Sequence, residues 1–233
     1  MTVVGILPAA GFATRLQPLG CSKEVLPIGG RPVMDYVVDR MRAGGCTELR
    51  LVTRVEKDDV VAHAEELGAT VLIATPATTS ESFAVGLRGL EPDDIVLLGW
   101  PDTLWEPADG YRQLVDAVES GAEIALGLFD LREDLERSDV VSFDEEGGIT
   151  GIHVKPSNPP STWIWGCAAA RAHALAGLER EEWPGSFFDS FCRRGGTLHG
   201  VRLSDVWLDI GTRPSLARAD ALLAVISPNP TKE

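Results

Sequence analysis

The first half of the chain alternates short apolar, β-branched runs with amphipathic stretches, and this alternation constrains the fold more than any other feature. Strands are expected over Val3–Leu7, Leu49–Thr53, Thr70–Thr75 and Ile95–Gly99. The helices expected between them cover Pro32–Gly45, Val60–Leu67 and Ser82–Leu90. Strands that are joined by helical crossovers pair in parallel, with right-handed connections. We therefore predict an α/β fold with a doubly wound, mostly parallel sheet, which carries ligands at the carboxyl ends of its strands.

The second half of the chain is richer in strands. The segments Val140–Phe143 and Ile149–Val154 flank a turn-forming Asp-Glu-Glu-Gly-Gly run, which indicates a β-hairpin. Further strands are expected over Ile124–Phe129, Trp163–Ala169 and Thr197–Arg202, and helices over Tyr111–Ser120, Ser186–Arg193 and Thr212 to about Val225. No low-complexity linker or internal repeat divides the chain. We expect one domain over residues 1–226, with a small β-rich subregion, and a frayed tail over residues 227–233.

Charge and composition exclude several classes of partner and reaction. The formal net charge of −14 opposes binding to nucleic acid or to anionic lipid, and no apolar stretch is long enough to span a membrane. The chain starts without a basic leader, so a cytoplasmic protein is expected. The four cysteines are too far apart for a zinc knuckle and are expected to be reduced. The H-E-x-x-H and G-x-S-x-G motifs of common hydrolases are absent.

A loop of small residues follows the first expected strand. Residues 7–19 read LPAAGFATRLQPL, and small side chains let backbone N–H groups approach a phosphate chain. The loop is not a Rossmann fingerprint, because Ala13 and Leu16 stand where that motif has glycine. It is not a P-loop either, since no Gly-Lys-Ser/Thr follows. The pattern indicates a phosphate cradle of another kind.

Two cations and two carboxylates are the main candidates for chemistry. Arg15 and Lys23 follow the small-residue loop, and a positive charge about 4 Å from a phosphate oxygen is worth roughly 4 kcal/mol at an effective dielectric constant near 20. Asp102 follows the strand that ends near Gly99, and Asp209 precedes the last helix. Two carboxylates could share one Mg²⁺, which prefers oxygen ligands. The alternatives are that the cations are solvated at the surface and that each aspartate caps a turn.

These segments together resemble the sugar-1-phosphate nucleotidylyltransferases, the NDP-sugar pyrophosphorylase family that includes glucose-1-phosphate thymidylyltransferase. The similarity is carried by GFATRLQPL at residues 11–19, SKEVLP at residues 22–27, GWPD at residues 99–102 and WLDIGT at residues 207–212. These motifs lie near both ends of the chain and in the family's order. The resemblance implies a Rossmann-like nucleotidyltransferase fold in which residues 1–122 mainly bind the nucleotide and residues 123–226 mainly bind the sugar phosphate.

The resemblance also implies roles for individual residues. Arg15 and Lys23 would be catalytic, holding the triphosphate and stabilising the departing pyrophosphate, and Asp102 and Asp209 would ligate Mg²⁺. Lys155 would bind the sugar phosphate. The glycine that leaves room near the sugar corresponds to Gly166, and the residues implied to contact the nucleotide are Ala9, Ala10, Gly11, Ala13 and Thr14.

The sequence departs from the family at several positions. Val154 stands where the family has a glutamate that contacts sugar hydroxyls, and Ala13 replaces a habitual glycine. The base-reading segment is Thr75–Ser80, which offers hydroxyls in place of the family's Gln and Pro-x-Gly. Trp163 and Trp165 are expected in the core, with the acceptor pocket or a subunit contact as the alternatives.

The leading hypothesis is a Mg²⁺-dependent enzyme that condenses an NTP, with dTTP or UTP favoured, with a sugar-1-phosphate to give an NDP-sugar and pyrophosphate. The departures leave two alternatives open. One is a nucleotidylyltransferase for another phosphate monoester, such as phosphocholine. The other is a non-catalytic domain that senses nucleotide or takes part in assembly. Nucleic acid and membranes are not expected as partners, and a homo-oligomer is allowed.

Overall fold

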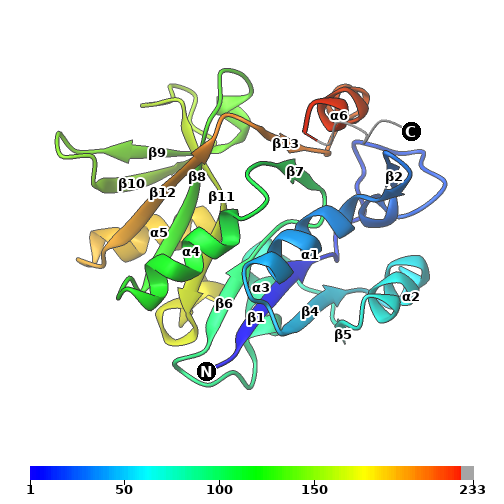
Figure 1. The fold of residues 1–233 in the computed structure, drawn as a ribbon, viewed down its shortest axis with the longest axis horizontal. Coiled ribbons are helices and arrows are strands. Elements are labelled where there is room, and N and C mark those ends of the chain that lie inside the picture. The colour runs from blue at the N-terminus through cyan, green and yellow to red at the C-terminus, as the bar shows by residue number, and fades with distance from the viewer. Residues whose placement is uncertain (227–233) are drawn as a thin grey trace, which may run out of the picture.

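The computed structural model describes residues 1–226, and the expected frayed tail lies outside them. A nine-stranded sheet runs through the molecule, with the strand order β10-β9-β11-β6-β1-β4-β5 along its main path and with β8 and β12 beside β11 (Figure 1). The parallel part consists of β1 (Val3–Pro8), β4 (Glu48–Thr53), β5 (Thr70–Ile73) and β6 (Ile95–Leu98). The other strands are β8 (Ile124–Asp130), β9 (Asp139–Phe143), β10 (Ile149–Val154), β11 (Trp163–Arg171) and β12 (Leu198–Ser204).

Helices cover both faces of the sheet, which confirms the predicted doubly wound α/β fold (Figure 1). One face packs against α1 (Val33–Ala43), α2 (Asp58–Glu66) and α4 (Gly110–Glu119), and the other packs against α3 (Thr79–Leu87) and α5 (Pro184–Arg193). The central strand β6 is apolar and buried along its whole length, as a parallel strand covered on both faces must be. Helix α3 lies close to the sheet because Gly86 faces Ile6, where an added Cβ would lie 2.4 Å from the nearest Ile6 atom.

The β-rich subregion is built on β11, which turns the sheet from parallel to antiparallel. Strand β11 pairs antiparallel with both β6 and β8, and its first residues contact β9. The predicted hairpin is β9–β10, closed by an Asp144–Gly148 turn in which the Asp144 carboxylate accepts the Gly148 N–H at 2.7 Å. Residues of this half of the sheet and residues that follow the parallel strand β6 line the same cavity.

Two small sheets and four 3₁₀ turns were not predicted. The strands β7 (Thr103–Trp105) and β13 (Trp207–Asp209) pair antiparallel, and β2 (Pro27–Ile28) pairs with β3 (Arg31–Pro32). The last helix, α6 (Arg213–Ile226), packs on this region through a small separate core that includes Leu104, Leu208 and Leu223. The 3₁₀ turns are η1 (Lys23–Val25), η2 (Leu135–Arg137), η3 (Ala172–Leu175) and η4 (Leu178–Arg180).

Most element ends differ from the sequence expectation by one to three residues, and two of these differences have a clear physical cause. Helix α3 stops at Leu87 instead of Leu90, since Gly89 adopts a φ of +74°, outside the helical region. Strand β5 ends at Ile73 instead of Thr75 because its only neighbour, β4, ends its pairing at Thr53.

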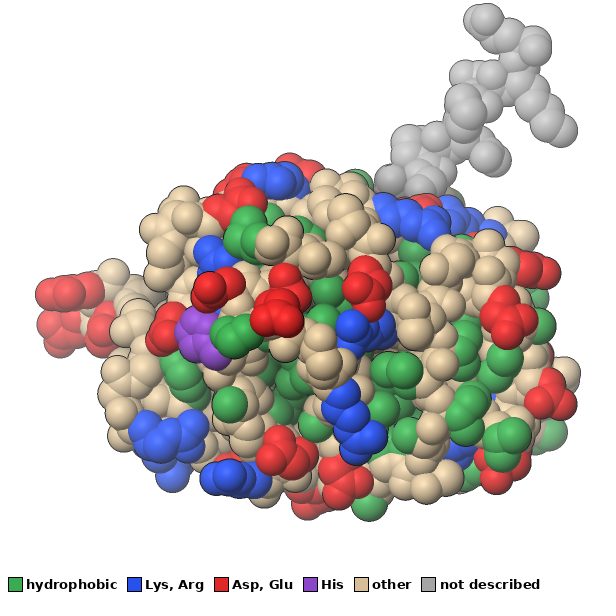
Figure 2. Space-filling model, turned by 90° about the horizontal axis from the view of Figure 1, so that it is seen from below, with side chains coloured by type: hydrophobic (Ala, Val, Ile, Leu, Met, Phe, Trp, Pro, Cys, Tyr) green, Lys and Arg blue, Asp and Glu red, His purple; other side chains and the backbone are tan. Residues whose placement is uncertain are grey.

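The surface and the cysteines agree with the sequence. On the face drawn in Figure 2, acidic and basic side chains are interspersed and no broad basic surface is seen. All four cysteines are free, and Cys167 is fully buried. Among the described residues, no helix combines the length and the apolar character that crossing a bilayer requires.

Candidate functional site

A cavity of about 980 Å³ lies where the parallel strands end and the β-rich subregion begins. It brings together six of the residues singled out in the sequence, and these are Arg15, Lys23, Asp102, Lys155, Gly166 and Asp209. They come from both ends and the middle of the chain. The placement agrees with the rule that α/β sheets bind ligands at the carboxyl ends of their strands.

The two aspartates meet because of the short β7–β13 sheet. Asp209 pairs with Thr103, the residue after Asp102, and the Ile210 N–H donates to the Asp102 carbonyl at 2.9 Å. The two carboxyl groups lie close enough to interact with each other directly. The hypothesis that Asp102 and Asp209 share one Mg²⁺ requires that their side chains lie close together, and the fold places them so.

The charges of this cluster depend on one another. Lys23 donates from Nζ to Asp102 Oδ2, and the Asp102 side chain is 6% exposed. Burial alone would lower the pKa of Lys23, but the carboxylates of Asp102 and Glu24 outweigh it and hold this pKa above its usual value. Burial, followed by the nearby Asp102 carboxylate, raises the pKa of Asp209 above its usual range, and Lys23 and Arg15 oppose this rise. The ionisation of the two carboxyl groups therefore depends on each other and on the two cations, Lys23 and Arg15.

The donor set suits a hard divalent cation. Asp102 and Asp209 are carboxylates that repel each other in a buried place, and a Mg²⁺ ion between such oxygens would relieve that repulsion. Within residues 1–226, no group of three or more His, Cys, Asp or Glu side chains is placed to hold a metal. A magnesium ion here would therefore take two protein ligands and complete its coordination with substrate oxygens and water.

The small-residue loop lies beside this cluster, and Arg15 is the one residue of the segment 7–19 that lines the large cavity. Ala9 and Ala10 are buried, whereas Thr14 is exposed. Gly11 and Ala13 line a second, smaller cavity of about 380 Å³ that shares Lys23 with the first. The Ala9 N–H already donates to the Val52 carbonyl at 2.7 Å, so the expected contact from this N–H to a nucleotide is not available.

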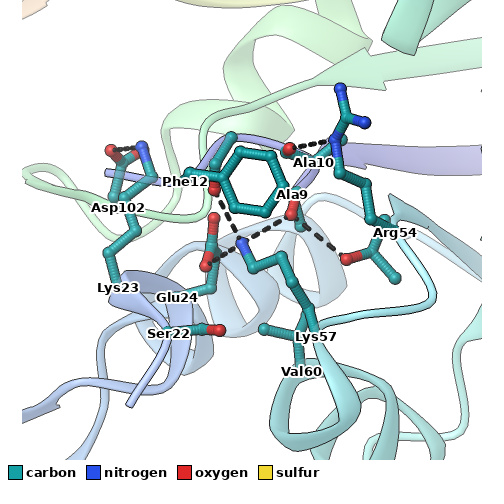
Figure 3. Close-up of polar contacts among 12 residues, drawn as sticks. Ala9, Ala10, Phe12, Ser22, Lys23, Glu24, Arg54, Lys57, Val60 and Asp102 are labelled. Atoms are coloured by element: carbon teal, nitrogen blue, oxygen red, sulfur yellow. Dashed lines mark hydrogen bonds and ion pairs between the residues drawn. The ribbon is translucent and has the colours of Figure 1, made fainter. Parts of the chain in front are cut away.

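Lys57 and Arg54 hold the carbonyl groups of this loop (Figure 3). Lys57 Nζ donates to the carbonyls of Ala9 and Gly11 at 2.7 and 3.0 Å, and Arg54 Nε donates to the Ala10 carbonyl at 2.9 Å. Within residues 1–226, the N–H groups of Ala10 and Gly11 have no acceptor. The loop therefore has its acceptors occupied and keeps donors available, as an anion-binding backbone requires.

Lys57 is itself neutralised by a buried partner. Its Nζ lies 2.6 Å from Glu24 Oε2, and the Glu24 side chain is fully buried. Burial lowers the pKa of Lys57 and raises that of Glu24, while the attraction between the two charges opposes both shifts. Sequence reasoning missed Lys57, Arg54 and Glu24, because nothing in their spacing shows that they meet at the loop.

Ala13 adopts a backbone conformation that is costly for a residue with a Cβ. Its φ is +51°, in the left-handed region that favours glycine. This geometry gives a physical reason for the glycine that the family usually has at this place. Lys155 is also left-handed, with a φ of +46°, so a strained residue lies on each side of the site.

The segment expected to read the base begins helix α3. The Thr78 hydroxyl accepts the Glu81 N–H at 3.0 Å, and Glu81 Oε2 accepts the Ala77 N–H at 2.6 Å. These reciprocal bonds cap the helix, so the Thr78 oxygen and the Glu81 carboxylate serve the fold. Within this segment, Thr79 is the residue that lines the large cavity.

The wall of the cavity is also aromatic. Four tryptophans line it, and they are Trp100, Trp165, Trp183 and Trp207. Lys155 Nζ lies 3.3 Å from the centre of the Trp183 ring, a cation–π contact. The space over Gly166 is filled by Trp207, whose Nε1 would lie 2.4 Å from an added Cβ. Gly166 thus makes room for this indole, and its predicted role toward a sugar stays a prediction.

Asp139 also lines this wall and was not singled out from the sequence. Burial raises the pKa of its carboxyl to about 6, although the Trp165 indole N–H and the Lys155 ammonium oppose the rise. In the sequence, Asp139 is only a charged residue directly before an expected strand. That pattern is too common to identify a functional residue. Trp165, expected in the core, is 4% exposed and also contributes to the cavity wall, and its contact with an acceptor stays a prediction.

Comparison with known proteins adds independent information. A glucose-1-phosphate thymidylyltransferase of Xanthomonas campestris is 26% identical over 249 residues, covering 95% of this chain and 81% of that protein. The low-salt glycan biosynthesis nucleotidyltransferase Agl11 of Haloferax volcanii is 25% identical, and the alignment covers 67% of this chain but 46% of that protein. A crystal structure of a putative glucose-1-phosphate thymidylyltransferase from Bacillus anthracis, in complex with sucrose, superposes with a TM-score of 0.83 at 21% identity and covers 99% of this chain and 98% of that one.

The family itself is assigned by a match that spans most of the chain. Residues 5–180 match the MobA-like NTP transferase domain. This range includes the loop after β1, the cation Lys23, the aspartate after β6 and the β9–β10 hairpin. The chain belongs to the MobA-like NTP transferase domain family.

Proposed function

We propose that the protein transfers a nucleotidyl group from an NTP to the phosphate of a sugar-1-phosphate, giving an NDP-sugar and pyrophosphate, with Mg²⁺ as cofactor. The observation that carries the proposal is the single cavity that has Arg15, Lys23 and the Asp102–Asp209 pair at one end and Lys155 at the other. A cavity of about 980 Å³ has room for two phosphate-bearing reactants.

The reaction forms one bond and breaks one. A phosphate oxygen of the acceptor attacks the α-phosphorus of the NTP, and the bond from that phosphorus to the oxygen bridging to the β-phosphate breaks. The electron pair leaves with pyrophosphate. The attacking oxygen is already anionic at neutral pH, so the step needs no general base. What it needs is alignment of the two reactants and compensation of the charge that develops in the transition state.

The chain's own groups meet these two needs. The free N–H groups of Ala10 and Gly11 would hold the phosphate chain of the NTP, and Arg15 and Lys23 would stabilise the charge on the pyrophosphate as it departs. Lys155 would bind the acceptor phosphate. A Mg²⁺ ion held by Asp102 and Asp209 would neutralise phosphate charge at the reacting centre.

The nature of both substrates is supported by the relatives. The Xanthomonas protein is named a glucose-1-phosphate thymidylyltransferase, and its alignment covers nearly the whole of this chain. We therefore expect dTTP or UTP as the donor and a hexose-1-phosphate as the acceptor. The hydroxyl of Thr79 is the side-chain group placed in the cavity near the base-reading segment.

The direct test is a matrix of NTPs against phosphate monoesters, assayed by pyrophosphate release with and without Mg²⁺. Turnover with a sugar-1-phosphate, and only with the metal, is expected. Asp209→Asn removes a charge from the pair while keeping its shape, and it should lower turnover by about 10²–10³. Wild-type pyrophosphate release by this variant would contradict the metal assignment, and nucleotide binding without any product would favour a non-catalytic domain.

A second acceptor class, phosphocholine, has one specific observation in its favour. The cavity wall combines tryptophan rings with carboxylates, and quaternary ammonium groups bind to aromatic faces. The acidic residues on this wall are Asp130, Glu133, Asp134, Glu136, Asp139 and Asp205. Phosphocholine is therefore included in the same matrix, and turnover with it but not with sugar phosphates would replace the leading proposal.

A further inference from the structure

Asp139 and Val154 are direct neighbours across the β9–β10 hairpin. The register pairs these two residues, the last of β10 with the first of β9. By the resemblance described above, position 154 is where a sugar nucleotidylyltransferase has the glutamate that contacts sugar hydroxyls. This chain has an apolar residue there, and its cross-strand partner is an aspartate that lines the cavity. The carboxylate is thus present on the same hairpin, moved to the adjacent strand.

The packing around Gly185 shows how close these two side chains lie. An added Cβ at Gly185 would lie 2.2 Å from Asp139 Oδ2 and 3.2 Å from Val154 Cγ2. Both side chains therefore reach the same place, against the first turn of α5. A carboxylate from either position would lie on the same side of the hairpin, next to Gly185, and at position 139 it lines the cavity.

The Asp139 carboxylate has acceptor positions that the protein does not use. Among residues 1–226, the hydrogen-bond donor beside it is the Trp165 indole N–H, whose interaction lowers the pKa of Asp139 and whose residue is 4% exposed. Both residues line the cavity. An ionised carboxylate can accept about four hydrogen bonds, so one neighbouring N–H leaves acceptor positions for a ligand.

We propose that Asp139 is a specificity-determining residue, which accepts hydrogen bonds from hydroxyl groups of the acceptor in place of a carboxylate at position 154. The Trp165 indole N–H lies beside this carboxylate and helps to orient it. The acceptor is accordingly a phosphate monoester with several hydroxyl groups, with its phosphate at Lys155 and its hydroxyls at Asp139. This inference rests on the proposed function, because it assumes that this end of the cavity binds the acceptor.

A purely structural role for Asp139 predicts different behaviour. Its carboxylate lies at the N-terminal turn of α5, where a negative charge stabilises a helix. The first bonds of this turn run from Ser186 N–H and Phe187 N–H to the Trp183 carbonyl, and none of them uses Asp139. A helix-stabilising charge would affect folding stability and leave the Michaelis constants of the two substrates unchanged.

The test separates the acceptor from the nucleotide by steady-state kinetics. Asp139→Ala should raise the KM of the sugar-1-phosphate by ~10–100-fold, as expected for the loss of hydrogen bonds to a charged group. The KM of the NTP should stay within ~3-fold of wild type, because the nucleotide lies at the other end of the cavity. Asp139→Asn keeps the shape and one acceptor oxygen and should have an intermediate effect, which covers the case in which the alanine variant does not fold.

A relocation variant adds a result that a structural role does not predict. In Asp139→Ala/Val154→Glu the carboxylate returns to the neighbouring strand, and the KM of the sugar phosphate should recover to within ~10-fold of wild type. An unchanged acceptor KM in Asp139→Ala, or a parallel rise for both substrates, overturns the inference. Failure of the proposed function looks different, since the wild-type protein would then show no turnover with any sugar phosphate.

Discussion

The loop after β1 and the β9–β10 side of the cavity differ in how their polar groups are satisfied. In the loop, the proposed nucleotide end of the site, Lys57 and Arg54 occupy the backbone carbonyls, and Lys57 is paired with the buried Glu24. On the β9–β10 side, the proposed acceptor end, the donor beside the Asp139 carboxylate is the Trp165 indole N–H. The loop is organised by bonds within the protein, and the Asp139 carboxylate keeps acceptor positions available.

The difference suggests a division of labour. A triphosphate is common to all donors, so a rigid backbone cradle held by internal bonds can serve every NTP without rearrangement. The acceptor must be distinguished from other phosphate monoesters, and a site with unsatisfied groups rejects ligands that cannot satisfy them. Substitutions at the two ends should therefore change different quantities.

The largest effect on stability is expected at the nucleotide end, from Lys57→Met. It leaves Glu24 buried without its partner, and breaking a buried ion pair in this way costs about 3–5 kcal/mol. The carbonyls of Ala9 and Gly11 also lose their donor, so the KM of the NTP should rise. Urea unfolding monitored by tryptophan fluorescence measures the first effect, and pyrophosphate release measures the second.

A double variant separates the two consequences. Lys57→Met/Glu24→Leu removes both charges, and replacing a buried pair with apolar residues is often neutral for stability. Most of the lost stability should return while the KM of the NTP stays high, because the loop carbonyls still lack a donor. If the KM of the NTP recovered together with stability, Lys57 would have no specific role in holding the loop.

The acceptor end should give the protein a distinct pH dependence of stability. Burial raises the pKa of Asp139 from its ordinary value of 3.8 to about 6. Between these values the folded state binds a proton that the unfolded state has released, so this contribution is full below about pH 4 and is lost as the pH rises through 6. The loss amounts to about 3 kcal/mol at most. The titrating group packed against it is Lys155, whose charge opposes the rise.

The comparison variant is Asp139→Asn, which cannot titrate. Free energies of unfolding from urea denaturation, measured every half unit from pH 4 to pH 7, should fall more steeply for wild type than for this variant. Subtracting the two profiles removes the contribution of other groups, including Asp209, whose pKa is also raised by burial. Parallel profiles would show that Asp139 is ionised in the folded protein throughout this range.

The regular part of the fold was predictable because its signals are local. Strand β6 is a continuous apolar run, and α1 has apolar residues along one face and glycines at its end. The sheets β2–β3 and β7–β13 gave no such signal, since strands of two or three residues are too short to show an alternation. Yet the β7–β13 sheet is the element that brings Asp102 and Asp209 together. The two aspartate motifs could therefore be recognised from the sequence, but the strand pairing that places them side by side could not.

The candidate site was predictable to a similar extent. Arg15, Lys23, Asp102 and Asp209 were singled out from their motifs, and all four line one cavity. Lys57 and Asp139 were missed, because each acts through a partner that is remote in sequence or on another strand. Contacts of this kind depend on register and on loop closure, which residue patterns do not specify.

Gly166→Ala should have a smaller effect on stability. It should also change catalysis indirectly, by displacing strand β13, which carries Asp209. An added Cβ would lie 2.4 Å from Trp207 Nε1, so the indole and its strand β13 must move, at a cost of about 1–3 kcal/mol. Asp209 is on the same strand, and its displacement should lower kcat more than it raises the KM of either substrate. Gly151→Ala, where the nearest atom is a side-chain oxygen 3.1 Å away, serves as the control.

The smallest effect is expected from Ala13→Gly, at the nucleotide end. Glycine adopts the left-handed φ of this position without the steric cost that a Cβ brings, but it also loses more conformational freedom on folding. The two terms nearly cancel, and we expect a gain in stability of less than about 1 kcal/mol, measured by urea denaturation. Ala10→Gly is the matched control, since Ala10 is buried in the same loop and has no positive φ, so this change should destabilise the protein. Destabilisation by Ala13→Gly of the same size as by the control would mean that contacts of the Ala13 methyl group, rather than its backbone conformation, decide which residue is favoured in the loop.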